Sequence, residues 1–394
     1  MKRKWLVVIG IVVVLLFSGC AQETQEAMED TIVIREETIE VSSNFPKIAS
    51  WVAKKDEIIT SGKPYSFVMG DWFTAEEAEQ IKSKNPDAKL LAGATINWVH
   101  DSSAYKGYIE TLGNFGKSKP IKIKEDMYLI KPNGQRCAFG WSSGEFNQGE
   151  FYVMDLRNSE WIELITSFYK NILDQPHHDG ITIDMISDAS PCPEAISDKE
   201  WQDETINILV SIKNLNSKNK LVIINSGGDI KYVAKYAEFF DGYLMEKFLS
   251  TKPFKPGWPL GATFTDGLKA ADSNHIVIYD VDTDDTGEKD LEKMRLGLTL
   301  SLLNDNTYFT YDFGPRDHGQ AWWFPEYDAE LGEPLGKYYK KDDGYYREFE
   351  NGIVVCSPVS DIIVIFDEEY TDITTNIKST SFTIAKGDGR IFIK

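Results

Sequence analysis

The feature that most constrains the fold of this chain is an alternation of short apolar runs with helix-like segments. Amphipathic stretches such as SEWIELITSFYKNILD separate eight runs, at 65–70, 89–96, 151–156, 180–185, 221–226, 242–248, 275–281 and 307–313. Strands that alternate with helices indicate βα units and a parallel sheet. Eight units over roughly 290 residues predict a (β/α)8 barrel. A doubly wound open sheet is the rival, but it requires a Gly-rich phosphate loop after the first strand, where this chain has GDWFTAEE.

The N-terminal segment has the form of an export signal. Residues 1–19 join Lys2, Arg3 and Lys4 to an apolar run. The run is shorter than the roughly 20 residues of a membrane-spanning helix. The ending FSGC resembles the lipobox of prokaryotic lipoproteins, in which the cysteine, here Cys20, is lipidated and becomes the mature N-terminus. Phe17 stands where leucine is usual, so an uncleaved anchor is the alternative.

Composition shifts divide the rest of the chain. Residues 20–45 are acidic and read as a tether, and residues 46–335 are assigned to the barrel as the catalytic domain. The last part, 336–394, alternates with period two and has turn signals at Asn351-Gly352 and Gly387-Asp388-Gly389, which predicts a small antiparallel, sandwich-like β domain. We therefore expect an extracytoplasmic protein that is tethered to the cell membrane.

Charge and cysteine content limit the partners. A formal net charge of −20 argues against binding nucleic acid or an anionic membrane surface. The chain lacks a CxxC motif, and the acid-rich stretch 280–292 has Asp285 and Leu291 where an EF-hand requires glycine and glutamate. We predict no metal or other cofactor, and a monomer. A Cys137–Cys192 bridge is conceivable in an oxidising compartment.

Polar side chains stand at or just past the ends of six apolar runs, and they are Asp155, Asp184, Asn225, Glu246, Asp280 and Asp312. In a barrel of this kind, catalytic groups lie at the carboxyl ends of the strands. The plain alternative is that several of them cap the following helix. Two carboxyls that face one cleft are the minimum for cleaving a glycosidic bond, because one protonates the leaving oxygen while the other attacks the anomeric carbon or activates water. Asp184 and Glu246 are the strongest such pair.

Aromatic residues supply candidate sugar-binding surfaces. Trp322, Trp323 and Tyr327 belong to a long loop after the eighth run, where they either stack on sugars or pack the β domain onto the barrel. Trp72 and Trp98 also follow strand ends and are weaker subsite candidates.

Several of these segments together resemble a known group of families. VMDLRNSEW, HDGITIDMISD, VIINSGG, DGYLMEKF and FTYDFG are similar to segments of hypothetical glycoside-hydrolase-like barrels. Those barrels are akin to endo-α-1,4-polygalactosaminidase and, more remotely, to the α-galactosidase-type barrels. The resemblance extends from about residue 65 to residue 394. It implies a nucleophile at the end of the fourth strand, matched by Asp184, and an acid/base after the sixth, matched by Glu246. The α-galactosidase type more often has aspartate at the sixth strand.

The sequence therefore predicts a surface lipoprotein that hydrolyses an extracellular poly- or oligosaccharide. Asp184 is the predicted nucleophile or base and Glu246 the general acid, while Asp155, Asn225, Asp280, Asp312 and the tryptophans hold the sugar. The main alternative is a lipoprotein that binds carbohydrate without cutting it. A solute-binding lipoprotein is a third possibility, but the terminal all-β segment argues against its two-lobed fold. The hydrolase requires the carboxyls of Asp184 and Glu246 to face one pocket within about 10 Å.

Overall fold

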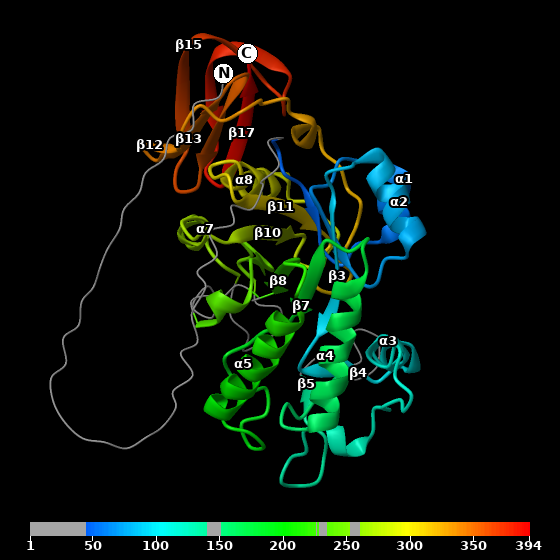
Figure 1. Ribbon diagram of the computed structural model, residues 1–394. Helices are drawn as coiled ribbons and strands as arrows, with labels where there is room; N and C mark the ends of the chain where they lie inside the picture. The colour runs from blue at the N-terminus through cyan, green and yellow to red at the C-terminus, as the bar shows by residue number, and fades with distance from the viewer. Residues whose placement is uncertain (1–44, 140–150, 226, 228–234, 253–260) are drawn as a thin grey trace, which may run out of the picture. The chain divides into compact units, whose positions relative to one another are not determined.

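The computed structural model describes residues 45–139, 151–225, 227, 235–252 and 261–394 (Figure 1). The predicted signal, Cys20 and almost all of the tether lie outside the described residues. Within those residues, no helix is long and apolar enough to cross a membrane.

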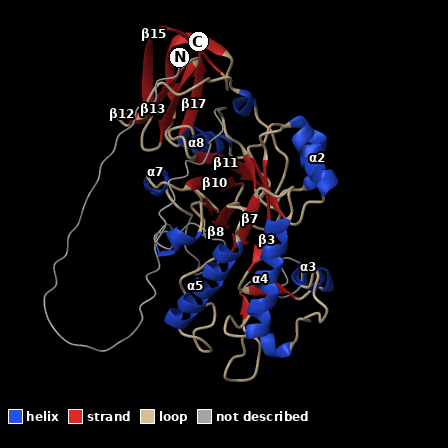
Figure 2. Ribbon diagram, in the orientation of Figure 1, coloured by secondary structure: helices blue, strands red, loops and turns tan. Residues whose placement is uncertain are grey.

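Eight parallel strands form the central sheet (Figures 1 and 2). In spatial order they are β1 (Ala49–Ser50), β2 (Phe67–Gly70), β3 (Lys89–Thr95), β7 (Gly180–Asp184), β8 (Leu221–Asn225), β9 (Gly242–Met245), β10 (Ile276–Asp282) and β11 (Thr307–Asp312). The last strand returns to the first, because the Phe309 amide donates to the Lys47 carbonyl at 3.0 Å and Ile48 forms a parallel bridge with Phe309. The sheet thus curls into the predicted (β/α)8 barrel.

One predicted barrel strand is wrong. The run 151–156 supplies β6 (Phe151–Val153), which pairs antiparallel with β4 (Trp98–His100) and β5 (Ala138–Phe139) in a separate three-stranded sheet. The barrel instead begins at β1, which has only two residues and makes no apolar run. Apolarity marks a buried strand but does not say which sheet it joins, so the count of eight was right with one wrong member.

A disulfide ties the small sheet to the barrel. Cys137, next to β5, is bonded to Cys192 in the connection after β7, with Cα atoms 6.1 Å apart. The bond closes a separation of 55 residues. The bridge that the sequence allowed is therefore present, and Cys356 is a buried free thiol.

Helices lie along the outside of the barrel (Figure 2). They are α1 (Lys55–Ser61), α2 (Ala75–Lys84), α3 (Ser103–Gly113), α4 (Ser159–Asp174), α5 (Asp198–Leu215), α7 (Phe264–Ala271) and α8 (Leu291–Ser301). Helix α4 shows why such segments fold: the Asn158 side chain accepts from the amides of Glu160 and Trp161, which satisfies two free donors at the helix start. Its buried positions, including Leu164 and Phe168, recur at helical spacing and face the sheet.

The barrel interior has an apolar floor and a polar top. Alternate residues of a strand point to the same face, and the inward set includes Phe67, Leu91, Ile223, Leu244 and Ile278, which pack together as one buried cluster. Two residues further along, the same inward face carries polar side chains. The strand register therefore places these polar side chains at the same level, at the carboxyl end of the barrel.

A six-stranded antiparallel sheet follows the barrel in sequence. Its order is β12 (Tyr339–Lys341), β13 (Gly344–Phe349), β14 (Gly352–Ser357), β17 (Asp388–Ile393), β15 (Ile362–Asp372) and β16 (Ile377–Ile384), as the sequence predicts. Helix α8 packs against it: Arg295 donates to both carboxylate oxygens of Asp388 at 2.8 and 2.9 Å in a buried ion pair. Gly389 permits this approach, since a Cβ there would lie 2.0 Å from the Thr299 hydroxyl.

Candidate active site

Strand alternation places five predicted site residues on the inward face of the barrel. Asp184, Asn225 and Asp312 are the last residues of β7, β8 and β11, Glu246 directly follows β9, and Asp280 lies near the end of β10. Asn225, Asp280 and Asp312 are almost fully buried. Adjacent parallel strands with like ends bring these groups together, which is the arrangement that barrel enzymes use.

Asn225 joins the two predicted catalytic acids. Its Nδ2 donates to Asp184 Oδ1 and to Glu246 Oε2, each at 2.8 Å. Its Oδ1 accepts from the Gly227 amide at 2.9 Å, which fixes the orientation of the side chain. Because both carboxylate oxygens lie 2.8 Å from one nitrogen, they are at most twice that distance, 5.6 Å, apart. The two acids face one another within the range that the two-carboxylate mechanism requires.

A histidine that the sequence analysis overlooked completes the cluster. His318 Nε2 lies 3.0 Å from Glu246 Oε1, and its Nδ1 lies 2.8 Å from Asp312 Oδ2. The ring thus bridges the end of β9 to the end of β11. It belongs to the long loop after the eighth strand, which the sequence marked only for its tryptophans; a histidine six residues beyond a strand-end aspartate was the available signal.

The loop that carries His318 is fixed by its neighbour. Gly319 has φ +88, and a Cβ there would lie 2.1 Å from the Val52 carbonyl. The Gly319 amide donates to Asp312 Oδ2 at 3.2 Å, and its carbonyl accepts from the Lys54 amide. Only glycine tolerates this conformation and approach, so the backbone holds the imidazole in place.

The surroundings shift the pKa values of the two acids in opposite directions. Burial and, next in size, the charge of Glu246 together raise the pKa of Asp184 to about 7. Burial also acts to raise the pKa of Glu246, but the hydrogen bond and charge of His318 outweigh it and lower that pKa. Burial acts to lower the pKa of His318, but Asp312 and Glu246 raise it well above its usual value. Near pH 7 Asp184 is therefore about half-protonated while Glu246 is ionised, so below this pH the proton of the pair rests on Asp184, whereas the sequence assigned it to Glu246.

Backbone strain marks the same two positions. Met185 follows Asp184 with φ +59, and Lys247 follows Glu246 with φ +54. Non-glycine residues rarely adopt this left-handed region, and such strain clusters at functional sites. Its occurrence directly after both acids distinguishes them from carboxylates that merely cap helices.

Asp280 is a fully buried acid of the same cluster. Neither of its carboxylate oxygens has a hydrogen-bond partner among the described residues. Burial and the charge of Asp312 raise its pKa well above the usual range, against the opposing charge of His318. Asp280, Asp312 and His318 each place one possible ligand atom within 4.8 Å of the others. The group is thus able to bind either sugar hydroxyls or a small cation.

The acid-rich stretch after β10 has a different role. Asp282 is fully buried and pairs with Lys247 at 3.3 Å, and Asp284 pairs with Lys293 at 3.3 Å. These ion pairs hold the segment after Glu246 against the end of β10, so the acids there are neutralised by lysines of the chain itself.

Asp155 does not join the site. It follows β6, which is not a barrel strand, and its carboxylate binds the Arg157 side chain at 2.7 Å. A local ion pair accounts for the acid at this position, and the structure does not bring Asp155 to the other predicted residues because the run before it belongs to the other sheet.

The predicted tryptophans are packed in separate places. Trp323 contacts Tyr65 and Tyr327 edge-on, and Trp322 packs against Tyr311, on the outward side of β11. This arrangement favours the packing alternative for the loop. Trp72 contacts the His178 ring, and Trp98 stacks on Tyr105 at 6.0 Å.

Comparison with known proteins agrees with this architecture. Residues 82–353 match the sequence profile of "Hypothetical glycosyl hydrolase family 15". No curated protein matches the chain. The isomalto-dextranase of Arthrobacter globiformis T6, solved with panose, has a similar fold: TM-score 0.50, 12% identity, 88% of this chain and 72% of that one. An α-amylase from Malbranchea cinnamomea gives TM-score 0.48, 11% identity and coverage of 88% and 96%. For the glycoside hydrolase domain of PelA from Pseudomonas aeruginosa, the TM-score is 0.44 and the identity 10%, and the match covers 69% of this chain and 97% of that one.

Proposed function

The chain belongs to hypothetical glycosyl hydrolase family 15, and on that premise we propose that it hydrolyses glycosidic bonds of an extracellular poly- or oligosaccharide with Asp184 and Glu246. The observation that carries the proposal is the single amide, Asn225 Nδ2, that bonds both carboxyls at 2.8 Å. Such a bridge fixes two acids on opposite sides of a small space, and one shared proton gives the pair an acid and a base together.

The separation favours retention of configuration. Retaining enzymes place their carboxyls about 5–5.5 Å apart, whereas inverting enzymes leave about 6.5–9.5 Å for a water molecule. The bonded oxygens here are at most 5.6 Å apart. We therefore infer that one carboxylate attacks the anomeric carbon directly, and that water then releases the sugar from the enzyme.

We assign the attack to Asp184 and proton donation to Glu246, on the match to the α-galactosidase-type barrels. The reaction then requires the shared proton on Glu246, although the resting site holds it on Asp184. His318 is placed to deliver a proton across the 3.0 Å contact from Nε2 to Oε1 of Glu246. Neutralising Glu246 removes one of the two causes that raise the pKa of Asp184. Asp184 then loses its own proton to water and attacks as the carboxylate while positive charge develops on the sugar, and His318 is left neutral until water returns a proton to it.

Asp280 is proposed to bind the sugar at this centre. A fully buried acid that has no hydrogen-bond partner among the described residues is unfavourable unless a ligand supplies hydrogen bonds. The raised pKa favours the protonated carboxyl, which both donates and accepts and so suits a sugar hydroxyl. Asp312 acts through His318, whose Nδ1 it contacts at 2.8 Å.

Sugar release from a panel of α- and β-linked polysaccharides tests the function. Asp184→Asn and Glu246→Gln preserve side-chain size, and Asp155→Asn is a matched control outside the site. We expect Asp184→Asn to lower kcat on the order of 10⁴-fold and Glu246→Gln by about 10²–10⁴-fold, with the control unchanged. Cleavage by both variants at the normal rate would remove the pair from the chemistry. Binding of a glycan without cleavage by the parent protein would instead identify a carbohydrate-binding protein.

We further propose that the protein is exported and lipidated at Cys20. The motif FSGC supports this, and the Cys137–Cys192 disulfide is of a kind that persists in oxidising compartments. Metabolic labelling with a radioactive fatty acid is expected to mark the parent protein but not Cys20→Ser. Equal labelling of both would disprove lipidation at this residue.

A further inference from the structure

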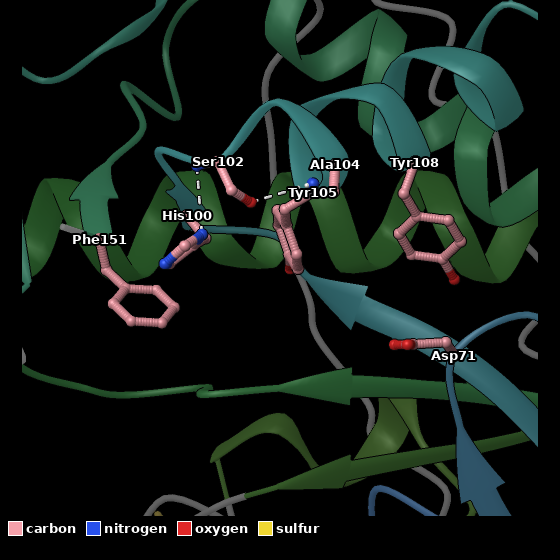
Figure 3. A pocket seen from close by; sticks show the side chains of 7 residues that line it. All are labelled: Asp71, His100, Ser102, Ala104, Tyr105, Tyr108 and Phe151. Atoms are coloured by element: carbon pink, nitrogen blue, oxygen red, sulfur yellow. Dashed lines mark hydrogen bonds between the residues drawn. The ribbon is translucent and has the colours of Figure 1, made fainter. Parts of the chain in front are cut away.

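A cavity of about 520 Å³ lies between the start of α3, the strands β4 and β6 of the small sheet, and Asp71 (Figure 3). Its lining includes Asp71, His100, Tyr105, Tyr108 and Phe151. The volume falls in the range of roughly 300–1,000 Å³ that is usual for small-ligand sites. None of these residues belongs to the Asp184–Glu246 cluster, so the cavity is an additional feature of this face of the molecule.

The cavity is connected to the reaction centre through β3. Tyr105 forms a hydrogen bond with the backbone of Thr95, the last residue of β3. Thr95 is paired in register with Asp184 on β7, and the charge of Asp184 raises the pKa of Tyr105. The cavity wall at Tyr105 is therefore separated from Asp184 by one hydrogen bond and one strand pairing.

The walls of the cavity are flat and rigid. The Tyr105 ring stacks on Trp98, with centroids 6.0 Å and planes 15° apart. Phe151 contacts both Trp98 and His100 edge-on at 4.6 Å. The rings of Tyr105 and Tyr108 project from α3 toward Asp71 (Figure 3). Aromatic faces held in this way suit the apolar faces of pyranose rings.

The cavity also holds one unused donor and one unused acceptor. His100 Nδ1 accepts from the Ser102 amide at 3.1 Å, so its Nε2 carries the proton, and this buried atom has no partner among the described residues. Asp71 is exposed at the mouth of the cavity and makes no hydrogen bond or ion pair within the same part of the chain. Donor and acceptor groups beside aromatic walls match the chemistry of sugar hydroxyls.

We propose that this cavity binds further sugar units of the substrate, adjoining the unit that lies between Asp184 and Glu246. This inference rests on the proposed function and narrows it: the substrate is a glycan chain rather than a glycoside of one sugar. Asp71 adds negative charge at the position where the chain continues. Neutral sugar units are therefore favoured there over uronic acids.

The test is equilibrium binding of oligosaccharides by the full chain carrying Asp184→Asn, which prevents turnover. The probes are fragments of one to six units, prepared from each polysaccharide that the parent protein cleaves, together with the malto-, cello- and chito-oligosaccharide series. Asp71→Ala and His100→Phe are the test substitutions. Asp87→Ala is the matched control, because Asp87 is exposed, lies two residues before β3 and is not part of the cavity lining.

We expect affinity to rise with fragment length. Each test substitution should weaken binding of the long fragments about tenfold, the loss of one hydrogen bond to a charged or buried group, and leave the shortest fragment and the control unchanged. Equal affinity of parent and test variants at every length would overturn the cavity assignment while leaving the hydrolase intact. Failure of every fragment to bind would also overturn it. The proposed function fails separately, if the parent protein cleaves no polysaccharide.

Discussion

The burial of Asp184 predicts a pH-dependent stability that one substitution removes. The pKa of Asp184 is about 7 in the folded protein, against an ordinary value of 3.8 for an aspartate in the unfolded chain. Between these values the folded state binds a proton that the unfolded state does not. Stability therefore falls as pH rises through this window, by about 1.4 kcal/mol per pH unit for one proton. From pH 5 to pH 7 the loss from this group amounts to about 2.3 kcal/mol, because Asp184 is already half-ionised at pH 7.

Urea unfolding at pH 5, 6, 7 and 8 measures this loss. Asp184→Asn keeps the shape of the side chain but cannot titrate, so the difference in unfolding free energy between variant and parent should shift by about 2–3 kcal/mol in favour of the variant across this range. Asp87→Asn, at an exposed position, should follow the parent at every pH. Parallel curves for the parent and Asp184→Asn would refute the burial and the charge coupling assigned to Asp184.

Three further predictions concern the histidine, the disulfide and the packing of the terminal sheet. His318→Gln should lower kcat more than it changes KM and shift the pH–rate profile, because the bridging proton is lost; an unchanged profile would refute the relay. Cys192→Ser removes the disulfide to Cys137, which closes a separation of 55 residues, and should lower the unfolding free energy by about 4 kcal/mol. An unfolding free energy of the parent protein that does not change when the disulfide is reduced would contradict this. Asp388→Asn leaves the buried Arg295 without its counterion and should cost about 3–5 kcal/mol, measured by denaturant unfolding; a loss below 1 kcal/mol would show that water reaches the pair.

Much of the fold was accessible from sequence because the barrel repeats one simple pattern. An apolar run that ends on a carboxylate, as at Asp184, indicates both the buried strand and the point at which its carboxyl end meets the site. The β1 strand escaped because two residues, Ala49 and Ser50, make no run. The run before Asp155 was misplaced because an apolar strand is equally stable in a second sheet. Pairing partners are set by the closed barrel and not by local composition.

The site was predictable only in part, for a related reason. The strand register fixes Asn225, Glu246 and Asp280 once the barrel is assumed. His318 comes from an irregular loop, and its position depends on Gly319 passing close to Val52, a contact that no periodic pattern encodes. The sequence also could not predict which acid holds the shared proton, because this depends on the contact of His318 with Glu246.

The most direct test of the account is rescue by azide of variants that lack one catalytic carboxyl. With an activated glycoside of the sugar that the panel identifies, Asp184→Gly should form a glycosyl azide of inverted configuration, because azide replaces the nucleophile. Glu246→Gly should form one of retained configuration, because azide attacks the glycosyl-enzyme. Proton NMR of the products distinguishes the two. The exchanged pattern would contradict the assigned roles, and the absence of any glycosyl azide from both variants would contradict the two-carboxylate mechanism itself.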